Sequence, residues 1–153
     1  MINIGILSST KGSDLPAIVG SINKGELKGL AKIVVIISDK KDSEILKKAE
    51  NFKIENYYLN LEERNREDYD KQISEILDEY KVELVALIGY MRLFSREFVE
   101  RYKNKIMNIH PSLLPLFPGI DRNVHQEVLD CGCKISGCTL FFVDEGKDTG
   151  PII

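Results

Sequence analysis

The chain has 153 residues, of which 43% are hydrophobic and 29% are charged, and these values are typical of one globular domain with a single core. Its net charge of -3 excludes an overall basic field that would hold a nucleic-acid backbone or an anionic membrane surface. The apolar run at residues 2–7 is too short for an export signal, and no run is long enough to span a membrane, so we expect a cytoplasmic protein with neither nucleic-acid nor membrane partners.

The first strand-like segment leads into a loop that has the features of an anion site. The apolar run 2–8 predicts a short buried strand, and apolar residues return at helical spacing from Leu15. Ser13 or Asp14 can cap this helix, and Gly12 lets the backbone approach a ligand. Free N–H groups at the start of the helix are suited to an anion, although a simple capped turn between a strand and a helix explains the same residues.

Strand-like and helix-like segments continue to alternate as far as residue 102. Continuous apolar runs such as 33–37 are typical of strands covered on both faces in a parallel sheet. Segment 66–80 instead carries one apolar stripe among charged residues, as an amphipathic helix does. This alternation predicts the α/β fold class, with a single doubly wound, mostly parallel, Rossmann-like sheet. The predicted strands lie at residues 2–8, 31–38, 57–59 and 84–88, and the predicted helices begin near residues 15, 43, 66 and 95.

The stretch 107–115, with the sequence MNIHPSLLP, brings two polar side chains to the end of a predicted strand. Alternate residues of a strand share a face, so Asn108 and His110 are expected side by side, while Ile109 points to the opposite face and into packing. Pro111 then ends the pairing. An amide that donates to an oxygen, next to an imidazole that carries a proton near neutral pH, suits acyl transfer. The same two polar groups would also serve to tie down a buried loop.

The topology favours a functional role for this pair. In a doubly wound sheet, ligands bind beyond the carboxyl ends of the strands, near the point where the strand order reverses. We therefore expect the loops that follow three of the strands to converge on one site. These loops are residues 8–14, 89–94 and 110–119.

The last third of the chain predicts one more helix and one more strand. A helix is expected at residues 123–129, where Gly132 closes it, and a strand is expected at residues 135–143. The acidic loop 144–150 follows, and the apolar residues 151–153 begin another strand.

The three cysteines, Cys131, Cys133 and Cys138, lie close together in the sequence. Their odd number does not suit a disulfide framework, and their spacing lacks the paired C-x-x-C of a zinc site. We therefore expect no metal site and predict that the cysteines are small buried side chains on a strand.

Three stretches together make this sequence resemble a known family. They are GYMRLFS at residues 89–95, NIHPSLLP at residues 108–115 and DTGPII at residues 148–153. On these motifs the chain resembles the phosphoribosylglycinamide formyltransferases, within the wider folate-dependent formyltransferase family. The resemblance implies one formyltransferase domain over residues 1–153. Because that family normally continues with another strand pair and a C-terminal helix, the resemblance also implies that this segment is missing from the chain.

The resemblance further implies a reaction and a catalytic trio. Members of the family transfer a formyl group from 10-formyltetrahydrofolate, a co-substrate, to the amine of glycinamide ribonucleotide in de novo purine biosynthesis, without a metal. Asn108 and a protonated His110 would stabilise the negative charge on the formyl oxygen, and His110 would help to deliver a proton to the departing folate nitrogen. Asp148 would pair with His110 and favour its charged form.

Two binding regions follow from the same resemblance. The phosphate of the ribonucleotide would lie at Gly12, Ser13 and Asp14, although the loop 9–12 is one residue longer than is usual and Asp14 replaces a common Asn. Lys11 would offset the charge of Asp14, or Asp14 would serve only as a helix cap. An apolar wall and free backbone groups in the folate-binding segment suit a flat, hydrogen-bonding pterin. The implied folate-binding residues are Arg66, Met91, Arg92, Leu93, Phe94, Asn108, Asp144, Glu145, Gly146, Lys147 and Asp148.

Two other functions stay open at this point. A formyltetrahydrofolate deformylase shares the Asn, His and Asp, but usually carries His-His-Ser or His-Gly-Ser where this chain has His110-Pro111-Ser112. A folate- or phosphate-binding module with weak catalysis would follow from the missing C-terminal segment. His125 is assigned no catalytic role, and a homodimer is compatible with the sequence.

Overall fold

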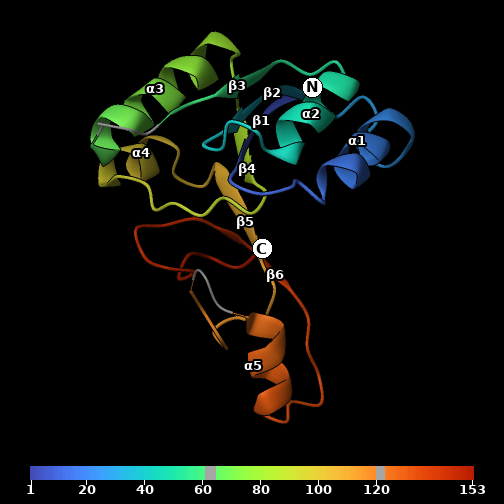
Figure 1. Cartoon of the computed structure of the whole chain (residues 1–153), viewed down its shortest axis with the longest axis vertical. Helices are drawn as coiled ribbons and strands as arrows, with labels where there is room; N and C mark the ends of the chain where they lie inside the picture. Colours follow the sequence, from blue (N-terminus) through green and yellow to red (C-terminus); the bar gives the residue numbers. More distant parts are fainter. Residues whose placement is uncertain (61–64, 120–122) are drawn as a thin grey trace.

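The computed structural model describes residues 1–60, 65–119 and 123–153. These residues form one sheet of six strands in the order β3-β2-β1-β4-β5-β6, in which every neighbouring pair is parallel except β5 and β6 (Figure 1). The order steps outward from β1 in both directions, which confirms the predicted doubly wound α/β sheet. The strands are β1 (Ile2–Ser8), β2 (Ala31–Ser38), β3 (Asn56–Tyr58), β4 (Leu84–Leu87), β5 (Ile106–His110) and β6 (Thr139–Phe142), and the helices are α1 (Leu15–Lys24), α2 (Glu44–Asn51), α3 (Arg66–Glu79), α4 (Arg96–Arg101) and α5 (Val124–Asp130).

Two hydrophobic clusters cover the two faces of this sheet. Successive side chains of β1 alternate between them, so Ile6 lies in one cluster and Leu7 in the other, and both are fully buried. Helices α1 and α2 pack over the face that carries Ile6, while α3 and α4 pack over the face that carries Leu7 (Figure 1). Burial on both faces explains why β1 and β2 are almost continuously apolar in sequence.

The loop after β1 and the loop after β4 lie against each other. The Ser9 N–H donates to the carbonyl of Gly89 at 3.2 Å, and the Met91 N–H donates to the Ser9 hydroxyl at 3.0 Å. Gly89 has a φ of +57°, and a Cβ atom at this position would lie only 2.3 Å from the hydroxyl oxygen of Thr10. The close approach of the two loops therefore requires a residue without a side chain at position 89.

Strand β6 is shorter than the sequence predicted. It begins at Thr139, which pairs with His110, rather than at residue 135. The neighbouring chain turns away at Pro111, which has no N–H to donate, so the pairing cannot continue beyond Thr139. The predicted strand 135–143 is therefore wrong at its start, and the side chain of Ile135 is exposed.

The cysteines are not buried, contrary to the prediction. Cys131 is the residue that ends α5, Cys131 and Cys138 are exposed, and Cys133 is half-buried. All three are free thiols. The prediction failed because it assumed a longer strand, whereas these residues lie in the irregular segment between α5 and β6.

Asp70 is a buried carboxylate on α3 that holds the start of α4. The residue is 4% exposed, and its carboxylate accepts a hydrogen bond from the N–H of Ser95. Burial raises the pKa of the Asp70 carboxyl, and the hydrogen bonds from Ser95 lower it by less. The net direction is upward, so the charged form is disfavoured in the folded state.

We predict that Asp70→Asn changes how stability depends on pH. Because the folded-state pKa of Asp70 is raised, its contribution to stability is present below the unfolded pKa and is lost as the pH rises through the folded pKa. Asn keeps an oxygen for the Ser95 N–H but carries no charge. In urea titrations, the free energy of unfolding of the variant should therefore increase relative to that of the wild type as the pH rises above the ordinary aspartate pKa of 3.8. A difference that is constant over this range would contradict the prediction.

Candidate active site

A cavity of about 290 Å³ lies where the loops after β1, β4 and β5 meet. We call it the central cavity, and its walls include Ser13, Met91, Asn108, His110 and Asp148. Ser13, Met91 and His110 come from the three loops that were expected to converge, and this prediction is therefore confirmed. A narrower space of about 60 Å³, the side cavity, lies against the loop 144–148, and Asn108 and Asp148 line both cavities.

His110 stands between two oxygen acceptors. Its Nδ1 is 3.5 Å from a carboxylate oxygen of Asp148, and its Nε2 is 2.7 Å from the carbonyl oxygen of Phe117. The side chains of His110 and Asp148 are only 6% and 11% exposed, so water screens their interaction weakly. Since both ring nitrogens face oxygens, both can carry a proton while the carboxylate offsets the charge.

Asp148 is held in place by its backbone as well as by its side chain. Its φ is +55°, which is a left-handed backbone conformation that residues other than Gly rarely adopt. The carboxylate oxygen that faces His110 also accepts a hydrogen bond from the Gly119 N–H at 2.7 Å. The carboxylate therefore joins the loop after β6 to the loop after β5, directly beside the imidazole.

Asn108 lies two residues before His110 on β5, so the two side chains share a face of the strand, as predicted. Within the described residues, the Asn108 amide has no hydrogen-bond partner, and its N–H groups are available to a molecule in the cavity. Ile109 does point to the opposite face, but the prediction that it packs there is wrong, because it is 49% exposed. Helix α5 lies beyond the end of β5 and not over the face of the sheet (Figure 1).

Ser13 and Asp14 reach the central cavity, whereas Gly12 packs against the side chain of Ile45. Asp14 is the residue before α1, but its side chain makes no capping hydrogen bond and instead accepts from the Ser13 hydroxyl at 3.2 Å. The predicted capping role of both residues is therefore wrong. Asp14 has helical backbone angles, and Pro16 lacks one of the N–H groups that a capping side chain would bind.

Two lysines flank this loop in different ways. The ammonium of Lys11 lies 3.7 Å from a carboxylate oxygen of Glu44, and both side chains are exposed, so Lys11 is not the partner of Asp14. The ammonium of Lys48 donates to the carbonyls of Lys11 and Gly12 at 2.7 and 3.1 Å. Lys48 is therefore the cation bound to the loop. The sequence did not reveal it, because α2 is distant from the loop along the chain.

Most of the predicted folate-binding residues line the side cavity. Met91 lines the central cavity instead, and Arg66, which is exposed at the start of α3, lines neither. At about 60 Å³ the side cavity is smaller than a typical ligand pocket, so a bicyclic pterin would enter it only if its walls moved apart. The predicted residues that line it are Arg92, Leu93, Phe94, Asn108, Asp144, Glu145, Gly146, Lys147 and Asp148.

Tyr90 is a wall residue of both cavities that the sequence reasoning missed. Its ring stacks on that of Phe94 with 5.1 Å between the centroids, and burial raises the pKa of its hydroxyl. Its position directly after Gly89, at the end of an apolar strand, was the available signal. Val124, at the start of α5, also borders the central cavity, and no local pattern connects it to the site.

The part of the chain that the structure describes contains neither a cluster of metal-binding side chains nor a helix suited to span a membrane. Within it, no three His, Cys, Asp or Glu side chains are grouped closely enough to hold a metal ion. The same residues contain no helix with the length and apolar character needed to cross a membrane.

Comparison with known proteins gives one family over nearly the whole chain. Residues 2–153 match the family model described as formyl transferase. The chain is 39% identical over 153 residues to the trifunctional purine biosynthetic protein adenosine-3 of Gallus gallus, and the match covers 99% of this chain and 15% of that protein. It is 38% identical over 154 residues to the phosphoribosylglycinamide formyltransferase of Bacillus subtilis, where 100% of this chain matches 77% of the relative.

Solved structures show the same similarity. The glycinamide ribonucleotide transformylase 1 of Symbiobacterium toebii superposes with a TM-score of 0.90 at 38% sequence identity, over 100% of this chain and 71% of that one. The chain thus spans about three quarters of the single-function relatives and about one seventh of the trifunctional ones.

We predict that Gly89→Ala disturbs the wall between the two loops. The added methyl group would lie 2.3 Å from the Thr10 hydroxyl oxygen and would occupy a left-handed backbone position, so we expect a loss of about 1–3 kcal/mol in unfolding free energy. Gly20→Ala is the matched control, because its methyl group meets no neighbour within 4 Å and lies inside helix α1. This control should be neutral or should stabilise by up to about 1 kcal/mol. Equal effects of the two substitutions in chemical denaturation would contradict the structural account.

Proposed function

The chain belongs to the formyl transferase family, and we propose that it transfers the formyl group of 10-formyltetrahydrofolate to the amino group of glycinamide ribonucleotide in de novo purine biosynthesis. The observation that supports this most directly is the contact of His110 with Asp148 at a cavity that Asn108 and the loop after β1 also line. An amide donor, an imidazole and a carboxylate are the groups that formyl transfer between two amines requires.

The reaction forms a bond from the acceptor nitrogen to the formyl carbon and breaks the bond from that carbon to the folate nitrogen. As the amine attacks, negative charge develops on the formyl oxygen, and the amide of Asn108 and the imidazolium of His110 are the donors available to it. The attacking amine loses one proton and the departing folate nitrogen gains one. His110 can carry this proton, because imidazole is the side chain that general acid–base catalysis uses most often and that of His110 is only 6% exposed to water.

The ring of His110 makes two contacts in the structure, and one of them must break before the ring can donate to a substrate. The carboxylate of Asp148 orients the ring and offsets its charge at Nδ1. The Nε2 proton is directed at the carbonyl of Phe117, so this nitrogen must leave the Phe117 oxygen before it can donate to a substrate. Phe117 has a φ of +53°, and its left-handed backbone is the element that would move.

The loop at residues 12–14 is the proposed site for the ribonucleotide phosphate. It precedes α1, whose N-terminal N–H groups and dipole favour an anion, and Lys48 adds a positive charge to the loop. The proposed pterin site is the side cavity, with Arg66 retained as a more distant folate contact. The proposed substrates are two small molecules.

An assay of formyl transfer tests this proposal. Incubation with 10-formyltetrahydrofolate and glycinamide ribonucleotide should consume both, whereas a deformylase would release formate without the ribonucleotide. A protein that binds both ligands in calorimetry without turnover would instead be a binding module. Either of these results would overturn the proposed transfer.

We predict that His110→Gln and Asp148→Asn each lower kcat by about two to four orders of magnitude, because they remove the proton carrier and its counter-charge. The binding of 10-formyltetrahydrofolate, measured by calorimetry, should change far less. His125→Gln is the matched control, since His125 is exposed and lies outside both cavities, and its kcat should equal that of the wild type. Full activity in either active-site variant would rule out the assigned mechanism.

A further inference from the structure

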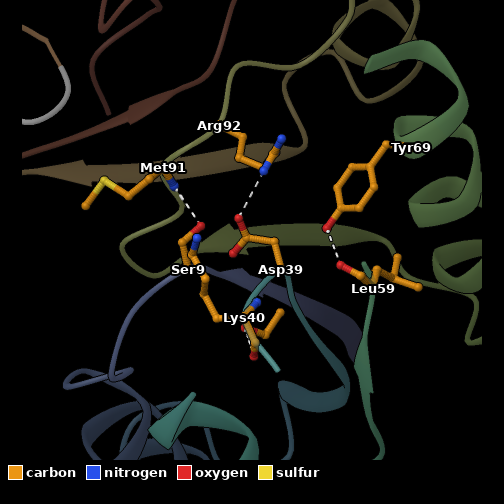
Figure 2. A network of polar contacts seen from close by, with 8 residues as sticks. Ser9, Asp39, Lys40, Leu59, Tyr69, Met91 and Arg92 are labelled. Carbon is orange, nitrogen blue, oxygen red and sulfur yellow. Dashed lines mark hydrogen bonds and ion pairs between the residues drawn. The ribbon is translucent and has the colours of Figure 1, made fainter. Parts of the chain in front are cut away.

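An ion pair joins two loops that the sheet keeps apart. Asp39 follows β2 and Arg92 follows β4, and in the sheet these strands lie on opposite sides of β1. Nη1 of Arg92 is 3.3 Å from a carboxylate oxygen of Asp39, so the pair crosses over the carboxyl end of β1 (Figure 2). Strands β2 and β4 are not adjacent in the sheet, so the two residues are in contact only because the loops that follow these strands converge.

The pair is largely removed from water. The Asp39 side chain is 3% exposed and that of Arg92 is 30% exposed. The guanidinium carbon of Arg92 also lies 5.3 Å from the ring centroid of Tyr69, whose hydroxyl donates to the carbonyl of Leu59 at 3.2 Å (Figure 2). The guanidinium is therefore held between a carboxylate and an aromatic face, both of which attract a cation.

Asp39 is a fixed partner rather than a mobile one. The N–H of Lys40 and the hydroxyl of Ser43 both donate to the hydroxyl of Ser38, at 3.1 and 2.9 Å, and these bonds set the turn that carries Asp39. The second carboxylate oxygen of Asp39 is buried and has no hydrogen-bond partner among the described residues. Because a buried carboxylate is costly without a counter-charge, Asp39 strongly favours the position of Arg92 that the structure shows.

The ion pair constrains the loop 90–94, which forms a wall of both cavities. This loop is fixed at two successive residues by different strands: the Met91 N–H binds the Ser9 hydroxyl after β1, and Arg92 binds Asp39 after β2 (Figure 2). Leu93 and Phe94 follow directly and line the side cavity. A backbone that is fixed before the ligand arrives loses less conformational freedom on binding.

We propose that Arg92 and Asp39 are positioning residues: their ion pair fixes the loop 90–94 in the form that binds folate, so that Asp39 sets folate affinity although it borders neither cavity. The proposal rests on the proposed function. It differs from direct recognition, in which the guanidinium of Arg92 would contact the folate itself and Asp39 would matter little. The two accounts separate cleanly, because only positioning makes Asp39 as important as Arg92.

The test compares Asp39→Asn, Arg92→Met and the double variant with the wild type. Calorimetric titration with 10-formyltetrahydrofolate should give a Kd raised by on the order of tenfold in each single variant, as is typical of coupled residues in one network. The double variant should be no weaker than Arg92→Met alone. The KM for folate should rise in parallel, while kcat and the KM for glycinamide ribonucleotide stay within about twofold, a split that a general loss of folding would not produce.

Two further variants test whether the loss of affinity comes from the ion pair of Arg92 and Asp39. Arg92→Lys keeps the charge and should recover part of the lost affinity. Arg101→Met is the matched control, because Arg101 also pairs with an aspartate, Asp78, and also lies over a tyrosine ring, that of Tyr102, at 5.7 Å, but it borders neither cavity. Its folate affinity should equal that of the wild type.

Four results would overturn the inference. Wild-type affinity in Asp39→Asn with a loss in Arg92→Met would mean that Arg92 contacts folate directly. Additive losses in the double variant would mean that the two residues act independently. A wild-type protein that binds no folate would refute the proposed function and this inference together, whereas a wild type that binds folate while both single variants bind equally well would refute the inference alone.

Discussion

The parallel pairing of β1 with both β2 and β4 is the constraint on which the site depends. Because the three strands run in one direction, their carboxyl ends meet at the same edge, and the loops that follow them must share the space beyond β1. That space is tight, since Gly89 and Thr10 touch and the Met91 N–H reaches Ser9. The residues that bind across it, Asp39 and Arg92 included, are neighbours only through this arrangement.

The two halves of the sheet are packed differently, and the division coincides with their roles. Strands β1, β2 and β4 are covered on both faces by helices α1 to α4, whereas β5 and β6 carry exposed apolar side chains such as Ile109 and Leu140. The proposed catalytic groups lie where these halves meet: His110 is the last residue of β5, and Asp148 lies on the loop beyond β6. The side that is covered on both faces thus presents the loops 9–14 and 90–94, and the less covered side presents the loop 144–148.

The sequence predicted features that depend on local pattern and missed those that depend on contact between distant segments. Continuous apolar runs were sufficient for the doubly wound sheet, and strand alternation placed Asn108 beside His110. The predicted start of β6 was wrong because a strand extends only as far as its partner strand, and β5 ends where the chain turns away at Pro111. Likewise, no local pattern could assign Lys48 to the loop before α1, because its two acceptors are carbonyl oxygens that every residue possesses.

The same lysine sets the direction in which the loop before α1 presents its backbone donors. A trans peptide places its C=O and the following N–H on opposite sides, so carbonyls of Lys11 and Gly12 that point at Lys48 require the N–H groups of Gly12 and Ser13 to point away from it. The ammonium therefore turns the donors of the loop toward its other side, where Ser13 borders the central cavity. The Asp14 carboxylate, meanwhile, accepts the Ser13 hydroxyl. An anion at this loop would therefore meet backbone donors backed by the Lys48 ammonium, whereas Lys11 is paired with Glu44.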